Sequence, residues 1–342
     1  MSNENNALIG KTVLITGGGG MIGSQICRQA AAMKPARIVC LGQNAENLKT
    51  VLEDLRKLSP SVEVVTEVCD VRERDRLATV FGVHRPSIVF HTAAKKDIRD
   101  AEANPAQAVT VNVQGTVNVV ELALASDSEK LVFTSSIKAF RPVGVMGATK
   151  RLGEMIVASA ADRTGKMFFT VRLGNVLESG GGVHDLFRRQ IASGGPVTVT
   201  HPDAERRFVT AAEAARLLLE TLSLGQPGDI LALATGEKTN IAKLALRLIR
   251  LNGSKLGHDI DIEYTGLRPG EKLVEEATLD GKEWLPTVHD KILVFSLAET
   301  VAPDTIFDLS LRELIAMLNN GDKGSLLEQL SELVTDYRPM SN

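Results

Sequence analysis

Short apolar runs alternate with longer stretches of helical character along the first half of the chain. The runs are three to seven residues long, and they lie at 11–16, 37–41, 62–68, 87–90, 131–133 and 168–172. A stretch with apolar residues at helical spacing follows each of them. Strands and helices that alternate in this order form a parallel sheet with helices on both faces. The pattern therefore predicts an α/β fold with a doubly wound parallel sheet.

The chain leaves this predicted sheet after residue 173. A helix over 183–193 and a strand at 197–200 follow, and we expect them to form a second, smaller α/β domain. Two amphipathic helices, over 309–319 and 325–336, are expected to cover a domain face or an oligomer surface. The expected boundaries are 7–173 for the first domain with a returning segment at about 205–235, 174–204 and 236–297 for the second, and 298–342 for a helical end.

Composition excludes several classes of protein. A chain of 342 residues suggests about two domains, and a net charge of −3 argues against nucleic acid as a partner. The absence of an apolar run of 18 residues predicts no transmembrane span, and the polar first ten residues argue against export, so we expect a cytoplasmic protein. Cys27, Cys40 and Cys69 are expected to be buried thiols, and the histidines have no metal-ligand spacing.

A glycine-rich turn joins the first strand to the first helix. The sequence from Thr16 to Ser24 reads T-G-G-G-G-M-I-G-S. Glycines allow the backbone to turn tightly beside a diphosphate, and the N–H groups at the helix start then face the anion. In this strand–turn–helix setting the pattern predicts a Rossmann dinucleotide site. The residues expected to form it are Gly17, Gly20, Met21, Ile22 and Gly23.

The ends of the second and third strands give the remaining cofactor contacts. Gln43 and Asn44 stand where an acid for ribose hydroxyls or an arginine for a 2′-phosphate is usual, with Glu46 close by. The choice between NAD and NADP is therefore open, and NAD is slightly favoured. Asp70 and Val71 follow the third strand. Asp70 is expected to hold the adenine amino group, although a helix-capping residue would look the same in sequence.

Two further segments are predicted to border the cofactor. Thr92, Ala93 and Ala94 follow the fourth strand, and small residues there allow a cofactor to lie close to the backbone. Asn112 lies inside the next helix, where asparagine is at best neutral. It is placed with the cofactor residues, and its side chain is expected to make a structural bond to the active-site strand. A solvent-exposed side chain is the alternative.

Hydroxyl and lysine side chains gather around the end of the fifth strand. Ser135, Ser136 and Lys138 follow that strand, and Lys150 lies in the first turns of the next helix. Ligands bind outside the carboxyl ends of the strands in open α/β sheets, so this cluster is a candidate catalytic site. An ordinary polar loop with solvated lysines is the alternative.

Arginines in loops of the second domain are candidates for binding a diphosphate. Arg206 precedes a strongly apolar helix, and Arg268 and Glu271 belong to the sequence L-R-P-G-E-K-L at 267–273. The guanidinium fork matches phosphate oxygens. Surface ion pairs are the alternative interpretation of these residues.

Several of these segments together resemble the extended short-chain dehydrogenases/reductases, and more narrowly the CapD-like nucleotide-sugar 4,6-dehydratases of bacterial polysaccharide biosynthesis, which act on UDP-N-acetylglucosamine. The resemblance covers nearly the whole chain. Its segments are the glycine-rich turn at 16–24, N-V-Q-G-T-V-N-V at 112–119, M-G-A-T-K-R-L at 146–152, R-L-G-N-V-L at 172–177, Q-I-A-S-G-G-P-V-T-V-T-H-P-D at 190–203 and L-R-P-G-E-K-L at 267–273.

The resemblance implies roles for individual residues. In the family, bound NAD(P)⁺ takes hydride from sugar C4, water leaves across C5–C6, and hydride returns to C6. Lys150 resembles the lysine that holds the nicotinamide ribose, Ser136 the hydroxyl at the C4 oxygen, and Lys138 the active-site lysine. The positions expected to contact a UDP-sugar are Lys96, Asp97, Asn175, Arg206, Arg268 and Glu271. A homo-oligomer is also expected from the resemblance.

Two positions depart from the family pattern. Met146 stands where most of the superfamily has a tyrosine base. The membrane-anchored dehydratases also have methionine at this position, so Met146 is placed with the catalytic residues. Ile137 stands where the family has the aspartate that helps to expel the C6 hydroxyl, and isoleucine cannot transfer a proton. Asp97 is a possible source of the missing carboxylate.

Three functions remain open at this point. The first is a UDP-N-acetylglucosamine 4,6-dehydratase-like enzyme, in which Lys138 acts as the base. The second is a nucleotide-sugar epimerase or keto-sugar oxidoreductase, which needs hydride transfer without loss of water. The third is a catalytically silent NAD(P)-binding partner, because fold alone does not fix function.

Overall fold

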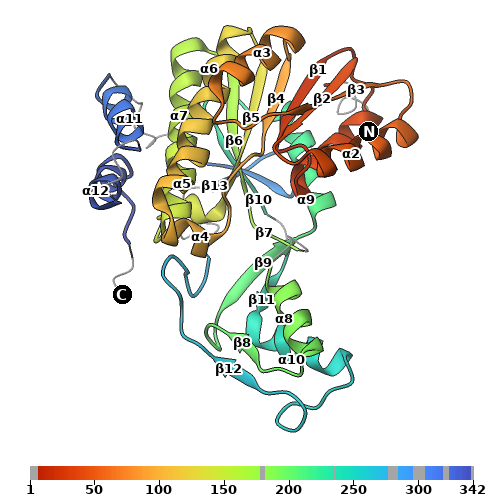
Figure 1. Ribbon diagram of the computed structural model, residues 1–342, viewed down its shortest axis with the longest axis vertical. Helices are drawn as coiled ribbons and strands as arrows, with labels where there is room; N and C mark the ends of the chain where they lie inside the picture. Colours follow the sequence, from red (N-terminus) through yellow and green to blue (C-terminus); the bar gives the residue numbers. More distant parts are fainter. Residues whose placement is uncertain are drawn as a thin grey trace.

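The computed structural model places a large α/β domain above a smaller one (Figure 1). It describes residues 7–177, 182–234, 236–275, 284–295, 305–318 and 323–339. The large domain is a sheet with helices on both faces, and the small domain lies beyond one end of its strands (Figure 1). This arrangement confirms the predicted fold class.

One nine-stranded sheet forms the centre of the large domain. Its order is β13-β14-β10-β6-β5-β4-β1-β2-β3, and only β13 and β14, at one edge, run antiparallel to their neighbours. The strands are β1 (Thr12–Thr16), β2 (Arg37–Gly42), β3 (Glu63–Val68), β4 (Ile88–His91), β5 (Lys130–Ser136), β6 (Met167–Leu173), β10 (Ile230–Leu233), β13 (Trp284–Pro286) and β14 (Ile292–Phe295). The chain leads from β1 to β2 on one side and from β4 to β5 on the other, so the connections after β1 and β4 run in opposite directions at the carboxyl edge of the sheet, where such folds bind ligands.

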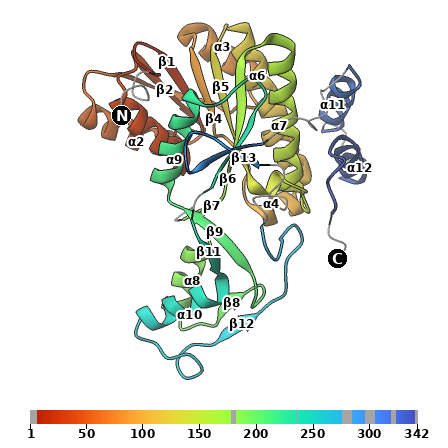
Figure 2. The same cartoon turned by 180° about the vertical axis from the view of Figure 1, so that it is seen from behind.

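Helices cover the two faces of the sheet and enclose two apolar layers. The helices on one side are α1 (Met21–Ala32), α2 (Ala45–Leu58) and α9 (Ala211–Glu220), and those on the other side are α3 (Arg74–His84), α6 (Gly115–Ala125) and α7 (Val145–Thr164). Figure 2 shows the two groups on opposite sides of the sheet. The predicted thiols Cys27, Cys40 and Cys69 are free and buried in these layers.

The segment from Pro105 to Ala125 is one continuous helical run. It consists of α5 (Pro105–Val109), a π-helical turn (Thr110–Gln114) and α6. By length and composition it is apolar enough to cross a membrane, but more than half of its most apolar window is buried inside the protein. Val109, Val113 and Val119 pack into the layer beneath α7, as expected of a core helix.

The small domain consists of two short sheets and two helices. β11 (Lys238–Asn240), β9 (Glu205–Val209) and β7 (Asn175–Val176) form one sheet, and β12 (Ile262–Tyr264) pairs with β8 (Val197–Val199) in the other. The helices α8 (Val183–Ala192) and α10 (Ile241–Leu251) bury Phe187 and Ile249 against these strands.

The observed domain boundaries differ from the expected ones in two places. Residues 284–295, expected in the second domain, form β13 and β14 and extend the large sheet. Residues 205–209, expected to return to the first domain, form β9 of the small domain, and the chain returns only with α9. A short strand carries no sequence signal of the sheet that it joins, because its pairing is made with distant partners.

Two C-terminal helices pack beside the large domain. They are α11 (Thr305–Met317) and α12 (Lys323–Leu333), which contact each other, and α12 contacts α5 and α7. Leu314, Leu326 and Leu330 are buried in the same apolar layer as the α7 side chains. The predicted amphipathic helices therefore cover the outer face of α7 (Figures 1 and 2).

Candidate active site

A cavity of about 540 Å³ lies between the carboxyl edge of the large sheet and the small domain. Both domains contribute to its wall, and most of the residues predicted from the sequence line it. These are Gly17, Gly20, Met21, Ile22, Gly23, Thr92, Ala93, Ala94, Lys96, Asp97, Ser136, Lys138, Met146, Lys150, Asn175, Arg206, Arg268 and Glu271. The structure thus brings the predicted cofactor and substrate residues to one continuous space.

The glycine-rich turn has a shape that only glycines allow. Gly17 has a φ of +68°, and a Cβ there would lie 2.9 Å from the backbone nitrogen of Ala93. A Cβ at Gly23 would lie 2.2 Å from the carbonyl oxygen of Gly17. Gly20 precedes α1 without a side-chain cap, so the N–H groups of the first helical turn are not used by a capping side chain. This cradle fits the diphosphate of a dinucleotide.

A second cavity of about 250 Å³ adjoins the first and shares Gly17, Gly20, Ala93 and Ala94 with it. Gln43, Asn44 and Val71 line it, as expected of the adenosine end of a dinucleotide site. The Asn44 side chain accepts a hydrogen bond of 2.9 Å from the N–H of Asn47, so it also caps α2.

Asp70, predicted to hold adenine, is committed to a neighbouring residue and lines neither cavity. Its carboxylate accepts from Nε of Arg72 at 2.8 Å and from the backbone N–H of Arg72 at 2.9 Å. Burial alone would raise the pKa of Asp70, but these bonds and the charge of Arg72 hold it below its usual value. These bonds commit Asp70 to the turn before α3 rather than to an adenine contact, and the helix-capping alternative is wrong as well, because Glu73 is the residue that precedes α3.

Asn112, placed with the cofactor residues, likewise lines neither cavity. It is buried, and its amide makes two bonds to the backbone of Lys95: it accepts from the N–H at 2.8 Å and donates to the carbonyl at 3.0 Å. It also donates to Oγ1 of Thr149 on α7. The structural bond was expected to reach the active-site strand β5, but it fixes the loop after β4 and joins it to α7.

Lys150 reaches the cavity from α7 beneath the end of β5. Its Nζ donates to the carbonyl oxygen of Thr134 at 2.8 Å and lies 4.7 Å from the centre of the Phe133 ring. Burial lowers the pKa of Lys150 to about 8, and Glu154 opposes this shift. Met146, one turn earlier on α7, is buried and lines the same cavity. Lys150 is thus a buried cation at the position expected for binding a ribose.

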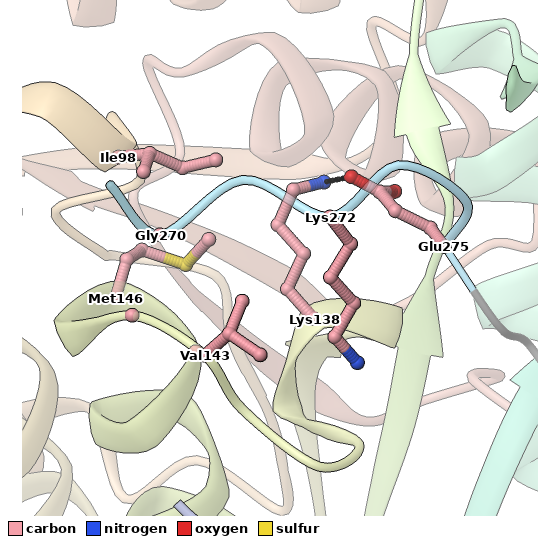
Figure 3. A pocket seen from close by; sticks show the side chains of 9 residues that line it. Ile98, Lys138, Val143, Met146, Gly270, Lys272 and Glu275 are labelled. Atoms are coloured by element: carbon pink, nitrogen blue, oxygen red, sulfur yellow. Dashed lines mark ion pairs between the residues drawn. The ribbon is translucent and has the colours of Figure 1, made fainter. Parts of the chain in front are cut away.

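Lys138 enters the cavity from the 3₁₀ turn Ile137–Ala139 and meets a carboxylate that the sequence analysis did not single out. Its Nζ lies 2.8 Å from Oε1 of Glu275 and donates to Oδ1 of Asn175 at 2.8 Å. Figure 3 shows Lys138 directed toward Glu275, whereas Lys272 runs in the opposite direction. Glu275 is the functional candidate that sequence reasoning missed, since no motif marks the acidic pair at 275–276.

Arg206 is less available to a ligand than expected. Its guanidinium donates to the backbone carbonyls of Glu205, Lys272 and Leu273, and its Nε lies 3.2 Å from Glu275. A guanidinium has five N–H groups, so these four contacts leave one for a substrate. Arg206 lines the cavity but mainly clamps the segment that carries Glu275.

The two serines at the end of β5 point to different partners. Ser135 donates to Glu154 at 2.6 Å, while Oγ of Ser136 accepts from the N–H of Lys138 at 3.2 Å. Both serines line the cavity, but Ser136 stays beside Lys138, whereas the Ser135 hydroxyl is held by the buried carboxylate of Glu154.

The other expected substrate residues line the cavity from two segments. Arg268 and Glu271 belong to the segment at 267–273, and Lys96 and Asp97 to the loop after β4. The Asp97 carboxylate accepts from the N–H of Asp100 at 3.0 Å and so caps α4 (Ile98–Ala103). Ile137 is buried, and no carboxylate takes its place in the 3₁₀ turn itself.

Comparison with known proteins decides the family. The family described as polysaccharide biosynthesis protein matches residues 13–297. The chain belongs to this family. Its fold is that of the extended short-chain dehydrogenases/reductases, as the sequence resemblance implied.

Two named relatives are similar to most of this chain. CapD, the capsular polysaccharide biosynthesis protein of Staphylococcus aureus, is 41% identical over 323 residues, which is 94% of this chain and 53% of CapD. The chain therefore spans about half the length of that relative. The UDP-glucose 4-epimerase of Rickettsia canadensis is 32% identical over 277 residues, which is 78% of this chain and 77% of the epimerase.

A solved structure has a similar fold. Pen from Bacillus thuringiensis matches with a TM-score of 0.76 and 30% identity, and the match covers 86% of this chain and 89% of Pen.

Proposed function

We propose that this protein is an NAD(P)-dependent enzyme that oxidises C4 of a UDP-N-acetylhexosamine, and that it acts as a 4,6-dehydratase of the UDP-N-acetylglucosamine type. The observation that carries the proposal is the single cavity in which the glycine-rich cradle, Lys138 and the segment of Arg268 and Glu271 all meet. The similarity to CapD, a capsular polysaccharide biosynthesis protein, supports a substrate from polysaccharide assembly.

The chain's own residues divide the work along this cavity. When bound, NAD(P)⁺ supplies the hydride acceptor for the sugar carbon. The N–H groups at the start of α1 hold the diphosphate of the dinucleotide, and Lys150 is placed to hold its ribose. Arg268 and Glu271 hold the uridine diphosphate end of the substrate at the far side of the cavity.

Lys138 and Ser136 act on the sugar. Ser136 is placed to hydrogen-bond the C4 oxygen. Lys138, when neutral, takes the proton from the C4 hydroxyl: the O–H bond breaks and an N–H bond forms at Nζ. The C4 ketone then acidifies C5: the C5–H bond breaks as its proton passes to a carboxylate, the C6–O bond breaks, and the carboxylate returns the proton to the leaving hydroxyl, which departs as water. Asp97 is the carboxylate of the loop after β4 that we assign to this second half of the reaction.

Epimerisation is the second candidate. It is favoured by the buried Ile137, which cannot move a proton, and by the similarity to a UDP-glucose 4-epimerase. An epimerase needs the same C4 oxidation but no elimination, so it would use Lys138, Ser136 and Lys150 without an additional acid.

Mass spectrometry and NMR of the product separate the candidates. The protein is incubated with UDP-N-acetylglucosamine and NAD⁺ or NADP⁺. A product lighter by one water supports the dehydratase. An isomeric product of unchanged mass, identified by its sugar proton couplings, supports the epimerase. Binding of a dinucleotide with no change in any UDP-sugar would contradict both and leave a silent binding partner.

A further inference from the structure

Glu275 is a buried carboxylate shared by three side chains from both domains. Its side chain is 4% exposed. Oε1 lies 2.8 Å from Nζ of Lys138 and 3.2 Å from Nε of Arg206, and Oε2 accepts from the amide of Asn175 at 2.8 Å. Both carboxylate oxygens are therefore used, and the group is fixed in position.

The charges around Glu275 keep it ionised. Burial alone would raise the pKa of Glu275, but the charges of Lys138 and Arg206 and the bonds to Lys138 and Asn175 hold it below its usual value. A cavity of about 10 Å³ lies beside the pair, and the charged side chains that line it are those of Lys138, Lys272 and Glu275. Lys272 is directed away from the pair and donates to the carbonyl oxygen of Phe140 (Figure 3). The carboxylate is thus available to Lys138 as a permanent anion.

The segment that carries Glu275 also packs against the start of α7. Gly270 packs against Gly144 at the start of α7, where a Cβ on Gly144 would lie 2.6 Å from the Gly270 Cα. Arg268 and Glu271 of the same segment line the large cavity. One short segment therefore bears both the residues assigned to the nucleotide and the partner of Lys138.

A base that is oriented by a third group is a recurring arrangement in enzymes. The third group holds the base in one geometry and stabilises the cation that forms when the base takes a proton. Glu275 has this relation to Lys138, because its oxygen lies at hydrogen-bond distance from Nζ while its other partners prevent it from turning away.

We propose that Glu275 is the positioning residue of the reaction: it orients Lys138 and stabilises the ammonium that forms when Lys138 accepts the C4 hydroxyl proton. Glu275 keeps its own charge throughout, and the proton stays on Nζ. This proposal rests on the proposed C4 oxidation.

The test compares Glu275→Gln with wild type in steady-state assays on UDP-N-acetylglucosamine. We expect kcat to fall about 100-fold, the order of magnitude of general-base catalysis, while KM changes less than about threefold because the nucleotide contacts remain.

A double-mutant cycle gives a second measurement. Lys138→Met and the double variant Lys138→Met/Glu275→Gln should have the same residual kcat, since Glu275 acts through Lys138. Glu263→Gln, an exposed residue of β12, is the matched control and should behave as wild type. Glu275→Asp keeps the charge but shortens the side chain, and its kcat should lie between those of Glu275→Gln and wild type.

The outcomes distinguish the two proposals. An inactive wild type would overturn the proposed function, and this inference with it. An active wild type with unchanged kcat in Glu275→Gln would overturn the role of Glu275 alone. A loss of UDP affinity and thermal stability in parallel with kcat, or failure of both Glu275 variants to fold, would also overturn it, because Glu275 would then serve only to join the domains.

Discussion

The carboxylate of Glu154 and the guanidinium of Arg172 form a buried pair behind the active-site strand. Oε1 of Glu154 accepts from Nε of Arg172 at 2.7 Å, and Oε2 accepts from Nη2 at 2.6 Å. Ser135 and Arg151 donate to the same carboxylate. Through Ser135 the pair thereby joins β5, β6 and α7, and two of these elements present side chains to the cavity, Ser136 from β5 and Lys150 from α7.

Substituting Glu154 should destabilise the fold strongly. In Glu154→Gln the Arg172 cation stays buried without an anionic partner, and breaking a buried pair from one side costs about 3–5 kcal/mol. Urea denaturation would measure the loss. Glu121→Gln is the matched control, because Glu121 pairs with Arg74 on the surface and both side chains are half exposed. Surface pairs contribute at most about 1 kcal/mol. Equal losses in the two variants would contradict the structural role of Glu154.

The buried Lys150 should make stability depend on alkaline pH. Burial lowers the pKa of Lys150 to about 8, below the ordinary value of about 10.4 that applies in the unfolded chain. Between these values the unfolded state binds more protons, so the contribution of Lys150 to stability rises with pH across this window. The free energy of unfolding of Lys150→Met minus that of wild type should therefore be highest at pH 7 and should fall from pH 8 to 10.

Thermal unfolding of both proteins in the absence of cofactor, in steps of pH from 7 to 10, would measure this dependence. Lys57→Met, at an exposed position of α2, is the control and should show a difference from wild type that is constant over this range. A constant difference for Lys150→Met would show that Lys150 does not titrate in that window.

The glycine-rich cradle should tolerate no side chain at Gly23. A Cβ there would lie 2.2 Å from the carbonyl oxygen of Gly17, so the backbone would have to move in the part of the turn that fits the diphosphate. Misplacement of a bound group by about 1 Å can lower a reaction rate about 100-fold. We expect a loss of dinucleotide affinity of the same order in Gly23→Ala, and fluorescence titration with NADH would measure it.

Gly82 in α3 is the matched control for this substitution. A Cβ there would meet nothing within 4 Å, and alanine is the better helix former by about 1 kcal/mol. Gly82→Ala should therefore bind NADH as wild type does and unfold at a slightly higher temperature. Wild-type affinity in Gly23→Ala would show that the turn does not hold the dinucleotide.

A substitution at Gly270 should weaken UDP binding without affecting dinucleotide binding. A Cβ at Gly270 would lie 2.8 Å from Oε1 of Glu102, which accepts from the N–H of Val145 at the start of α7. Gly266→Ala is the matched control, because both glycines have a φ of about +80° but a Cβ at Gly266 would meet nothing within 4 Å. Both variants share the backbone strain of about 1–2 kcal/mol, and only Gly270→Ala adds the collision.

Calorimetric titration with UDP would compare the two glycine variants. We expect Gly270→Ala to bind UDP several-fold more weakly than Gly266→Ala, since a lost cap costs about 1 kcal/mol. Equal affinities would show that the contact between the 267–273 segment and α7 does not position the nucleotide residues.

Local patterns were sufficient to predict six of the nine strands of the large sheet, β1 to β6, and much of the cavity. The strands were recognisable because buried parallel strands are short apolar runs, and the cradle at Gly17 was recognisable because its geometry admits only glycine. The side chains at strand ends were harder to assign. Asp70 and Asn112 have the polarity expected of ligand contacts, but each is used by neighbouring backbone, and sequence alone does not distinguish the two uses. A homo-oligomeric state and a cytoplasmic location remain predictions from the sequence.

The sequence by itself determined the order of strands and helices, the glycine-rich turn and the placement of Lys150 on the helix after β5. Each of these depends on residues within one or two elements. Only the tertiary structure decided which distant groups share the cavity: the pairing of Lys138 with Glu275, the use of Arg206 to clamp a backbone segment, and the return of residues 284–295 to the large sheet. These contacts join residues far apart in the chain, and their energy comes from burial and charge pairing that exist only once the chain has folded.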